Sequence, residues 1–159
     1  RFSEFSRMPR PQRKPTDMNE VVRSVLRVFQ AQLAEKAQIT VHQELDPEIP
    51  RISADAELLH RALSNLVLNA IDALPQGGTI TVRTESAGDQ VAISVSDTGS
   101  GLTEEECARL FTPYYTTKQH GTGLGLAIVQ SVVSDHGGKI SVESTKESGT
   151  TFRIELPRE

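Results

Sequence analysis

Apolar and polar residues recur along this chain with two different periods, which divide it into helices and strands. In three stretches the apolar residues return every three or four positions, as they do on one face of a helix. Each of the first two stretches is preceded by residues that can cap a helix. The predicted helices run from a cap at Thr16 or Asp17 to about Leu33, from a cap at Ser53 or Asp55 to about Leu74, and over residues 123–136.

Between these helices the period is two, which is typical of strands with one buried face. Gly88 and Asp89 separate two such runs and predict a hairpin turn. The element order is helix, strand, helix, two strands, loop, helix, two strands. It predicts an α+β fold, in which one mixed, mainly antiparallel sheet is covered on one face by helices. The predicted strands are 38–44, 79–85, 90–96, 139–144 and 150–156.

Composition narrows the classes of protein that fit this pattern. The 159 residues suit about one domain, and 36% hydrophobic and 24% charged residues are ordinary for a globular protein. A net charge of −4 gives no argument for binding nucleic acid. There is no signal peptide and no apolar stretch approaching the roughly 20 residues that span a bilayer. The single Cys107 cannot form an internal disulfide, which favours a reducing compartment.

These features lead us to expect a soluble, cytoplasmic fragment. The chain begins at Arg1 without Met, and we expect it to be a piece of a longer protein. Whether that parent protein is anchored in the inner membrane stays open.

The first residues differ from the rest of the chain. They are basic, and three prolines within them rule out a continuing helix. One interpretation is a solvated linker. The other is that Phe2, Phe5 and Met8, spaced three residues apart, finish an amphipathic helix of a preceding domain. We therefore divide the chain into 1–15, the end of a helix and a linker, and 16–159, the domain.

Polar side chains form a stripe along the second predicted helix. At about 100° per residue, Asn65, Asn69 and Asp72 lie within roughly 60° of one another, with Arg61 beside them. A solvated stripe would normally hold Glu, Lys and Gln, which are better helix formers than Asn. Two amides one turn apart therefore indicate contact with a ligand. The carbonyl oxygen of Asn suits Mg²⁺ that is also bound to nucleotide phosphates.

Asp97 follows the strand 90–96 and has two interpretations that the sequence leaves open. It can belong to a simple Asp-x-Gly turn. It can also accept a hydrogen bond from the exocyclic amine of a bound adenine. In that case Gly99 and Gly101 would let the backbone lie close to the flat ring, because they lack Cβ atoms.

Three glycines, Gly121, Gly123 and Gly125, lead into the third predicted helix. A helix N-terminus with glycines around it favours phosphate binding. The spacing is neither a Rossmann fingerprint nor a Walker loop. The preceding segment, 98–120, contains one short helical stretch at about 103–110. Loops of this length are usually functional lids or disordered.

Taken in order, these segments resemble the N, G1 and G2 boxes of the GHKL ATPase superfamily, and residues 110–118 resemble the F box of sensor histidine kinases. The resemblance covers about residues 16–157. It implies a Bergerat-type ATP-binding fold, a two-layer α/β sandwich with three main helices on one face of the sheet. The Asn-Ala-Ile-Asp-Ala and Pro-Tyr-Tyr-Thr-Thr-Lys forms are similar to the nitrogen-regulation branch, NtrB or NtrY.

The resemblance also implies roles for individual residues. Asn69 would bind Mg²⁺ with Asn65 beside the phosphates, and no other residue of the chain is expected to be catalytic. Asp97 would hold the adenine amine, directly and through water shared with Thr150. The role of Asp72 stays open, because many sensor kinases carry Lys or Arg there. The implied nucleotide-binding residues are Asn65, Asn69, Asp72, Asp97, Gly99, Gly101, Phe111, Lys118, Gly121, Thr122, Gly123, Leu124, Gly125 and Thr150.

The function that the resemblance implies is that of an ATP-binding catalytic domain of a two-component sensor histidine kinase. Such a domain transfers the γ-phosphate of ATP to a His on a separate dimerisation domain, for relay to the receiver domain of a response regulator. None of the four histidines here has the sequence context of that acceptor; they are His42, His60, His120 and His136.

Two alternatives stay open: a self-contained GHKL ATPase, and a nucleotide-binding scaffold without catalysis. ATPases of the gyrase and mismatch-repair types carry a water-activating Glu where this chain has Asn65. An amide is no general base, so the position favours the kinase.

Overall fold

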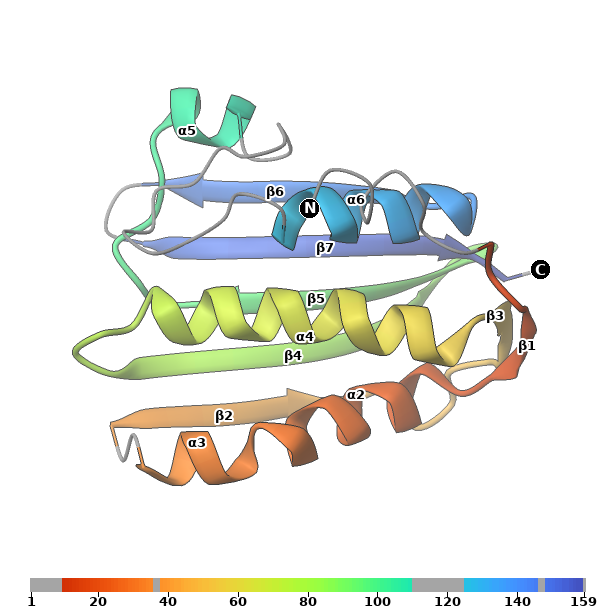
Figure 1. Cartoon of the computed structure of the whole chain (residues 1–159), viewed down its shortest axis with the longest axis horizontal. Coiled ribbons are helices and arrows are strands. Elements are labelled where there is room, and N and C mark those ends of the chain that lie inside the picture. Colours follow the sequence, from red (N-terminus) through yellow and green to blue (C-terminus); the bar gives the residue numbers. More distant parts are fainter. Residues whose placement is uncertain (1–9, 36–37, 110–124, 146–147, 159) are drawn as a thin grey trace.

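The structure is a computed structural model that describes residues 10–35, 38–109, 125–145 and 148–158. Within these residues the larger sheet contains β2 (Ile39–Glu44), β4 (Gly78–Ala87), β5 (Gln90–Asp97), β6 (Lys139–Thr145) and β7 (Gly149–Pro157). Their order across the sheet is β2-β4-β5-β7-β6 (Figure 1). β2 runs parallel to β4, and every other neighbouring pair is antiparallel. The predicted mixed, mainly antiparallel sheet is confirmed.

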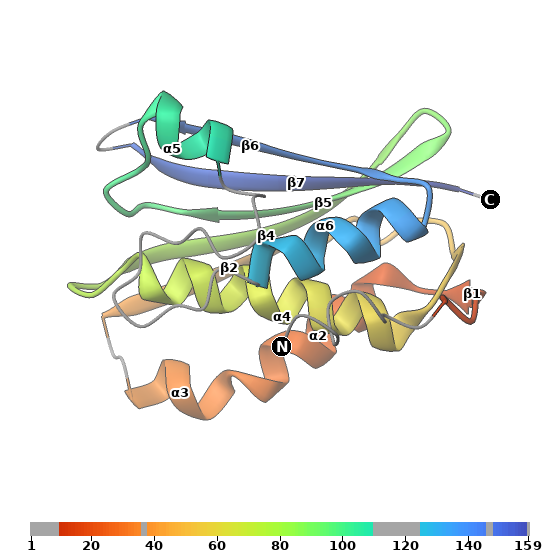
Figure 2. The ribbon, with the colours of Figure 1, turned by 45° about the horizontal axis from the view of Figure 1, so that its top comes forward.

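Three main helices cover one face of this sheet, as predicted (Figure 2). They are α2 (Met18–Val28), α4 (Ala56–Asp72) and α6 (Gly125–Asp135). The shorter α3 (Gln30–Glu35) follows α2, and α5 (Glu104–Arg109) lies next to β6. None of the helices in the described residues is long and apolar enough to cross a membrane.

The core lies between the helices and the sheet, and it is aliphatic. Alternate residues of the central strands point into it, because successive side chains of a strand face opposite sides. α4 is the central helix of the layer and buries residues along most of its length. Fully buried side chains at this interface include Leu59, Leu66 and Ile71 of α4, Ile80 of β4, Ile93 of β5, and Ile154 and Leu156 of β7.

Aspartates begin two of the main helices. The side chain of Asp17 accepts a hydrogen bond from the N–H of Asn19 at 2.9 Å. Asp55 accepts hydrogen bonds from the N–H groups of Glu57 and Leu58, each at 3.1 Å. Of the alternatives that the sequence left open, the caps are therefore Asp17 and Asp55.

A second, two-stranded sheet is absent from the sequence-based prediction. β1 (Lys14–Thr16) pairs antiparallel with β3 (Ile52–Ala54), so Thr16 and Ser53 lie in strands rather than at caps. Strands of three residues are too short for an alternating pattern to be recognised. β1 begins at Lys14, before the expected start of the domain at residue 16, so the last part of the expected linker is in fact paired in a sheet.

Candidate nucleotide-binding site

Two pairs of residues show how α4 and α6 lie against each other. At one end, the N–H of Asp55 donates to Nε2 of His136 at 3.0 Å. At the other end, a Cβ placed on Gly125 would lie 3.4 Å from Oδ1 of Asn65. The two helices are therefore antiparallel, and α4 continues past the N-terminus of α6 (Figure 1). At 1.5 Å per residue, Asn69 lies about 6 Å and Asp72 about 10 Å beyond the level of Asn65.

His136 has a structural role at the end of α6. It is 2% exposed, and its Nδ1 lies 2.8 Å from the carbonyl oxygen of Val132. A tautomer with its hydrogen on Nδ1 satisfies both ring nitrogens, because Nε2 already accepts from Asp55. His42 lies on β2 and His60 on α4, within the strand and the helix predicted for these residues, and His120 lies outside the described residues.

The predicted polar stripe meets the N-terminus of α6. Asn65 is half-buried, and its Nδ2 donates to the carbonyl of Arg61 at 3.2 Å, while its Oδ1 lies on the side of Gly125. Asn69 is half-buried and Asp72 is exposed, one and two turns further along α4. The first N–H groups of a helix have no partner within the helix and favour an anion. The structure thus brings Asn65, and the stripe that continues from it, beside a potential phosphate site.

Asp97 forms the other end of the candidate site. It is the last residue of β5 and is 8% exposed. Its Oδ1 accepts a hydrogen bond from the N–H of Gly99 at 2.9 Å, which is the turn that one interpretation predicted. Burial raises the pKa of the Asp97 carboxyl, while hydrogen bonds from the N–H groups of Gly99 and Thr150 oppose the rise. No cation in the described residues forms an ion pair with it.

A carboxylate that is buried without a cationic partner is costly, which makes it a candidate for ligand recognition. Thr150 lies directly opposite Asp97 in the β5–β7 pairing and is 7% exposed. The two side chains therefore place their oxygens at the same end of the sheet. One carboxylate oxygen closes the turn, which confirms the turn interpretation. The adenine interpretation of Asp97 stays a prediction.

Glycines let the backbone close around Asp97. A Cβ on Gly99 would lie 2.5 Å from the carbonyl oxygen of Ala73, just after α4. A Cβ on Gly149, where φ is +92°, would overlap the backbone oxygen of Asp97. Gly101 has a φ of +78°, so it is needed for its backbone conformation. Sequence reasoning did not assign Gly149 to the site, because only the strand register places it against Asp97.

The two ends are joined by α4. Asn65 lies at the end beside α6 and Ala73 at the end beside Asp97, and the two residues are about 12 Å apart along the helix axis at 1.5 Å per residue. Asn69 lies between them. This row of polar groups suits an elongated ligand that carries a hydrogen-bond donor at one end and negative charge at the other.

The residues present also fit Mg²⁺ bound to such a ligand. The described residues contain no group of three His, Cys, Asp or Glu side chains that could hold a metal ion by themselves. Asn69 offers a neutral, hard oxygen, and Mg²⁺ is usually held by few protein ligands together with phosphate oxygens and water. The donor set therefore suits a metal that arrives with a nucleotide.

Six of the predicted site residues cannot be placed. They lie outside the described residues, and their predicted roles remain predictions: Phe111, Lys118, Gly121, Thr122, Gly123 and Leu124.

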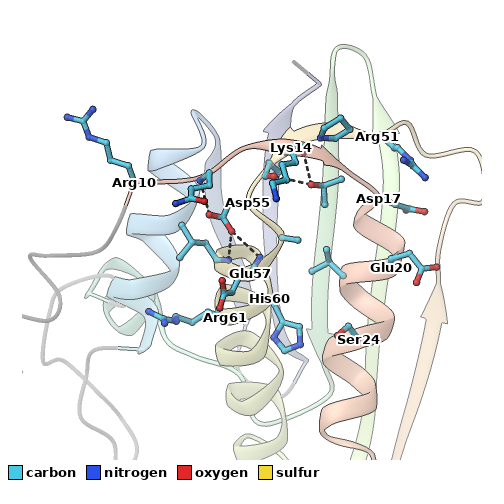
Figure 3. Close-up of a pocket in the computed structure, with 17 residues that line it drawn as sticks. Arg10, Lys14, Asp17, Glu20, Ser24, Arg51, Asp55, Glu57, His60 and Arg61 are labelled. Atoms are coloured by element: carbon cyan, nitrogen blue, oxygen red, sulfur yellow. Dashed lines mark hydrogen bonds between the residues drawn. The ribbon is translucent and has the colours of Figure 1, made fainter.

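A pocket of about 750 Å³ lies at the opposite end of α4 and does not coincide with this site. Its walls come from β1, β3, the first turns of α2 and the first turns of α4 (Figure 3). Basic side chains such as Arg10 and Arg51 and acidic ones such as Asp17 and Glu57 line it together. It contains none of the predicted nucleotide-binding residues.

One further polar residue touches the Asp97 end without any signal in the sequence. Ser144 on β6 is half-buried, and its Oγ lies 2.8 Å from Oγ1 of Thr150. An isolated serine on a strand has no pattern that marks it. Only the β6–β7 pairing, in which Ser144 is opposite Thr150, brings it to the site.

The raised pKa of Asp97 predicts how stability changes with pH. Because the folded state binds this proton more tightly than the unfolded state, the contribution of Asp97 to stability grows as pH falls from the raised pKa towards the unfolded value of about 3.9. We expect the free energy of unfolding of the wild type, relative to Asp97→Asn, to rise over this window in urea titrations.

Asp55 is the control for this prediction, because its pKa is shifted in the opposite direction. Although burial raises its pKa, hydrogen bonds from the N–H groups of Gln12, Leu58 and Glu57 outweigh burial and lower it. Relative to Asp55→Asn, the wild type should therefore lose stability as pH falls through the lowered pKa. The difference in the free energy of unfolding between the wild type and each variant should therefore change in opposite directions with pH. If it changed in the same direction for Asp97→Asn and Asp55→Asn, the raised pKa assigned to Asp97 would be contradicted.

Comparison with known proteins agrees with this geometry. Residues 54–159 match the family model described as "Histidine kinase-, DNA gyrase B-, and HSP90-like ATPase". The sensor histidine kinase ZraS of Klebsiella oxytoca is 41% identical over 159 residues, which cover 98% of this chain and 34% of that protein. The chain thus spans about a third of the length of this curated relative.

Solved structures show the same domain. The nucleotide-free catalytic domain of histidine kinase ThkA superposes with a TM-score of 0.84 at 35% identity, covering 92% of this chain and 96% of that one. ThkA in complex with response regulator protein TrrA superposes with a TM-score of 0.85 at 31% identity, covering 99% of this chain and 45% of that one. Full-length ShkA in complex with AMPPNP superposes with a TM-score of 0.86 at 27% identity, covering 98% of this chain and 33% of that one. The chain therefore belongs to the histidine kinase-, DNA gyrase B- and HSP90-like ATPase family, as an ATP-binding catalytic domain of a sensor histidine kinase.

Proposed function

We propose that this domain binds ATP together with Mg²⁺ and transfers the γ-phosphate to a His on the dimerisation domain of the same protein. The observation that carries the proposal is the position of α4. Its last turns lie beyond the N-terminus of α6 and end beside Gly99, so one helix extends past both places where we propose that phosphate and adenine bind.

Each group has a defined task in this proposal. Asp97 accepts a hydrogen bond from the adenine amine, and the N-terminus of α6 receives the phosphates. Asn69 would hold Mg²⁺, which when bound neutralises charge on the phosphate oxygens. Catalysis then rests on positioning, because the acceptor His attacks in line with the bond to the leaving group and little covalent chemistry is left to this domain.

Asn65 favours transfer over hydrolysis. Its amide nitrogen donates to the carbonyl of Arg61, and its oxygen lies on the side of Gly125. An amide at this position can orient a phosphate but cannot remove a proton from water. The kinase is therefore the better proposal than a self-contained ATPase.

The loop before α6 would complete the site. We propose that Gly121, Thr122, Gly123 and Leu124 offer backbone N–H groups to the phosphates, that Lys118 adds a cation, and that Phe111 packs the loop. The role of Asp72 is open: it lies on the same stripe as Asn69, but a carboxylate does not attract phosphate directly.

The remaining assignments concern the parent protein. We propose that residues 1–15 end a dimerisation helix and form the linker. This is supported by the three-residue spacing of Phe2, Phe5 and Met8. Two bonds tie the linker to the domain, from the N–H of Gln12 to Asp55 at 2.8 Å and from Arg13 to the carbonyl of Asp135 at 2.9 Å. A receiver domain as partner is supported by the similarity to ThkA, which has been solved in complex with the response regulator protein TrrA. A membrane anchor on the parent is a further proposal.

The nitrogen-regulation branch, NtrB or NtrY, is also only a proposal. It is supported by the Asn-Ala-Ile-Asp-Ala and Pro-Tyr-Tyr-Thr-Thr-Lys forms of the sequence. The relative reported above is a ZraS kinase, which does not support that branch.

Calorimetry with ATP tests the nucleotide site. We expect the wild type to bind ATP more tightly with Mg²⁺ than with EDTA, because the metal joins Asn69 to the phosphates. Asn69→Ala should lose most of this difference. Asp97→Asn should weaken binding in both conditions, because the new amide can donate towards the adenine amine. ATP binding that is insensitive to both substitutions would contradict the site.

Glycine substitutions test the close approach beside Asp97. Gly99→Ala should reduce ATP affinity at least about tenfold, because its Cβ meets the carbonyl of Ala73 and displaces the turn. Gly88→Ala is the matched control. Gly88 has a φ of +67°, and a Cβ added there would have no atom within 4 Å. The substitution should therefore cost about 1 kcal/mol of stability and leave ATP affinity unchanged. Equal affinities in the two variants would show that the turn does not bind nucleotide.

A further inference from the structure

Three hydrogen bonds converge on the hydroxyl of Ser144. It lies 2.8 Å from Oγ1 of Thr150, it donates to the carbonyl of Gly149 at 2.8 Å, and it accepts from the N–H of Leu102 at 2.8 Å. β6, the start of β7 and the segment that leads to α5 therefore meet at this one atom.

Only one arrangement of hydrogens satisfies all three contacts. A serine hydroxyl carries a single hydrogen, and a carbonyl oxygen can only accept. The hydrogen of Ser144 therefore goes to Gly149, and the Ser144–Thr150 bond must use the hydrogen of Thr150. The hydroxyl of Thr150 can then only accept a hydrogen bond from any further partner, because its single hydrogen is already donated.

This matters because Thr150 lies opposite Asp97 at the adenine end. Both residues are at least nine-tenths buried, on the inner face of the sheet. With the hydrogen of Thr150 committed to Ser144, the two side chains offer only acceptors when Asp97 is ionised. Acceptors bind the amino group of a base and reject a carbonyl oxygen at the same position.

We propose that Ser144 is a positioning residue for base selection: it holds the Thr150 hydroxyl as an acceptor, so that the site prefers a 6-amino purine to a 6-oxo purine. The inference rests on the proposed ATP site and deepens it. Ser144 does not itself touch the nucleotide in this proposal, because it acts through Thr150.

The same hydroxyl links base selection to the segment after β5. Gly99 of this segment bonds to Asp97, and Leu102 bonds to Ser144. α5 begins directly afterwards, where Thr103 and Glu106 exchange reciprocal bonds of 2.9 and 3.1 Å. Ser144 thus holds the segment at the point where it leaves the base site.

The test compares the affinities for ATP and inosine triphosphate, in which a carbonyl replaces the amino group. We expect the wild type to prefer ATP. Ser144→Ala should reduce this preference about tenfold, because the freed hydroxyl of Thr150 can then donate to the carbonyl. Ser144→Thr, which keeps a hydroxyl, should restore the preference. If Ser144 had a purely structural role, Ser144→Ala would lower the affinities for ATP and inosine triphosphate by the same factor.

A control pair lies one residue away from Asp97 on β5 and from Thr150 on β7. Ser96 and Thr151 form the same kind of pair, at 2.8 Å, on the opposite face of β5 and β7. Ser96→Ala should leave the preference unchanged. If Ser144→Ala does not fold, Ser144→Cys gives the same comparison, because a thiol is a weak hydrogen-bonding group of similar size.

The outcomes separate the two proposals. A wild type that binds neither nucleotide would overturn the proposed ATP site. A wild type that prefers ATP, with an unchanged ratio in Ser144→Ala, would overturn the role of Ser144 and leave the ATP site standing.

Discussion

The antiparallel packing of α4 and α6 is the constraint on which the site depends. At one end buried His136 accepts a hydrogen bond from the N–H of Asp55, and at the other end Gly125 lies beside Asn65. Because α4 has 17 residues and α6 has 11, the packing leaves the end of α4 beyond the start of α6. The packing of these two helices thus places the N-terminus of α6 beside a row of polar side chains on α4.

Burial of Asp97 is the second requirement, and it carries a cost. The carboxylate sits at the end of a core strand with a raised pKa, and backbone N–H groups offset only part of the desolvation. A core residue selected for stability alone would be apolar at this place. The proposed recognition of a ligand's amine by this carboxylate would account for the cost, and glycines at 99 and 149 give the backbone room around it.

Much of the fold follows from sequence periodicity, because the helices and the long strands each bury one regular face. The polar stripe on α4 follows for the same reason, since Asn65, Asn69 and Asp72 share a face of one helix. The β1–β3 sheet could not be predicted, because its strands are three residues long. Ser144 and Gly149 could not be assigned to the site either, since their roles arise from strand register, which brings together residues that are distant in sequence.

The most direct measurement of function is phosphotransfer to a separately prepared dimerisation domain that carries the acceptor His. With γ-labelled ATP and Mg²⁺, we expect acid-labile label on that partner and little hydrolysis by this domain alone, because Asn65 cannot activate water. Brisk release of phosphate by the domain alone, with no label on the partner, would contradict the kinase and favour a self-contained ATPase.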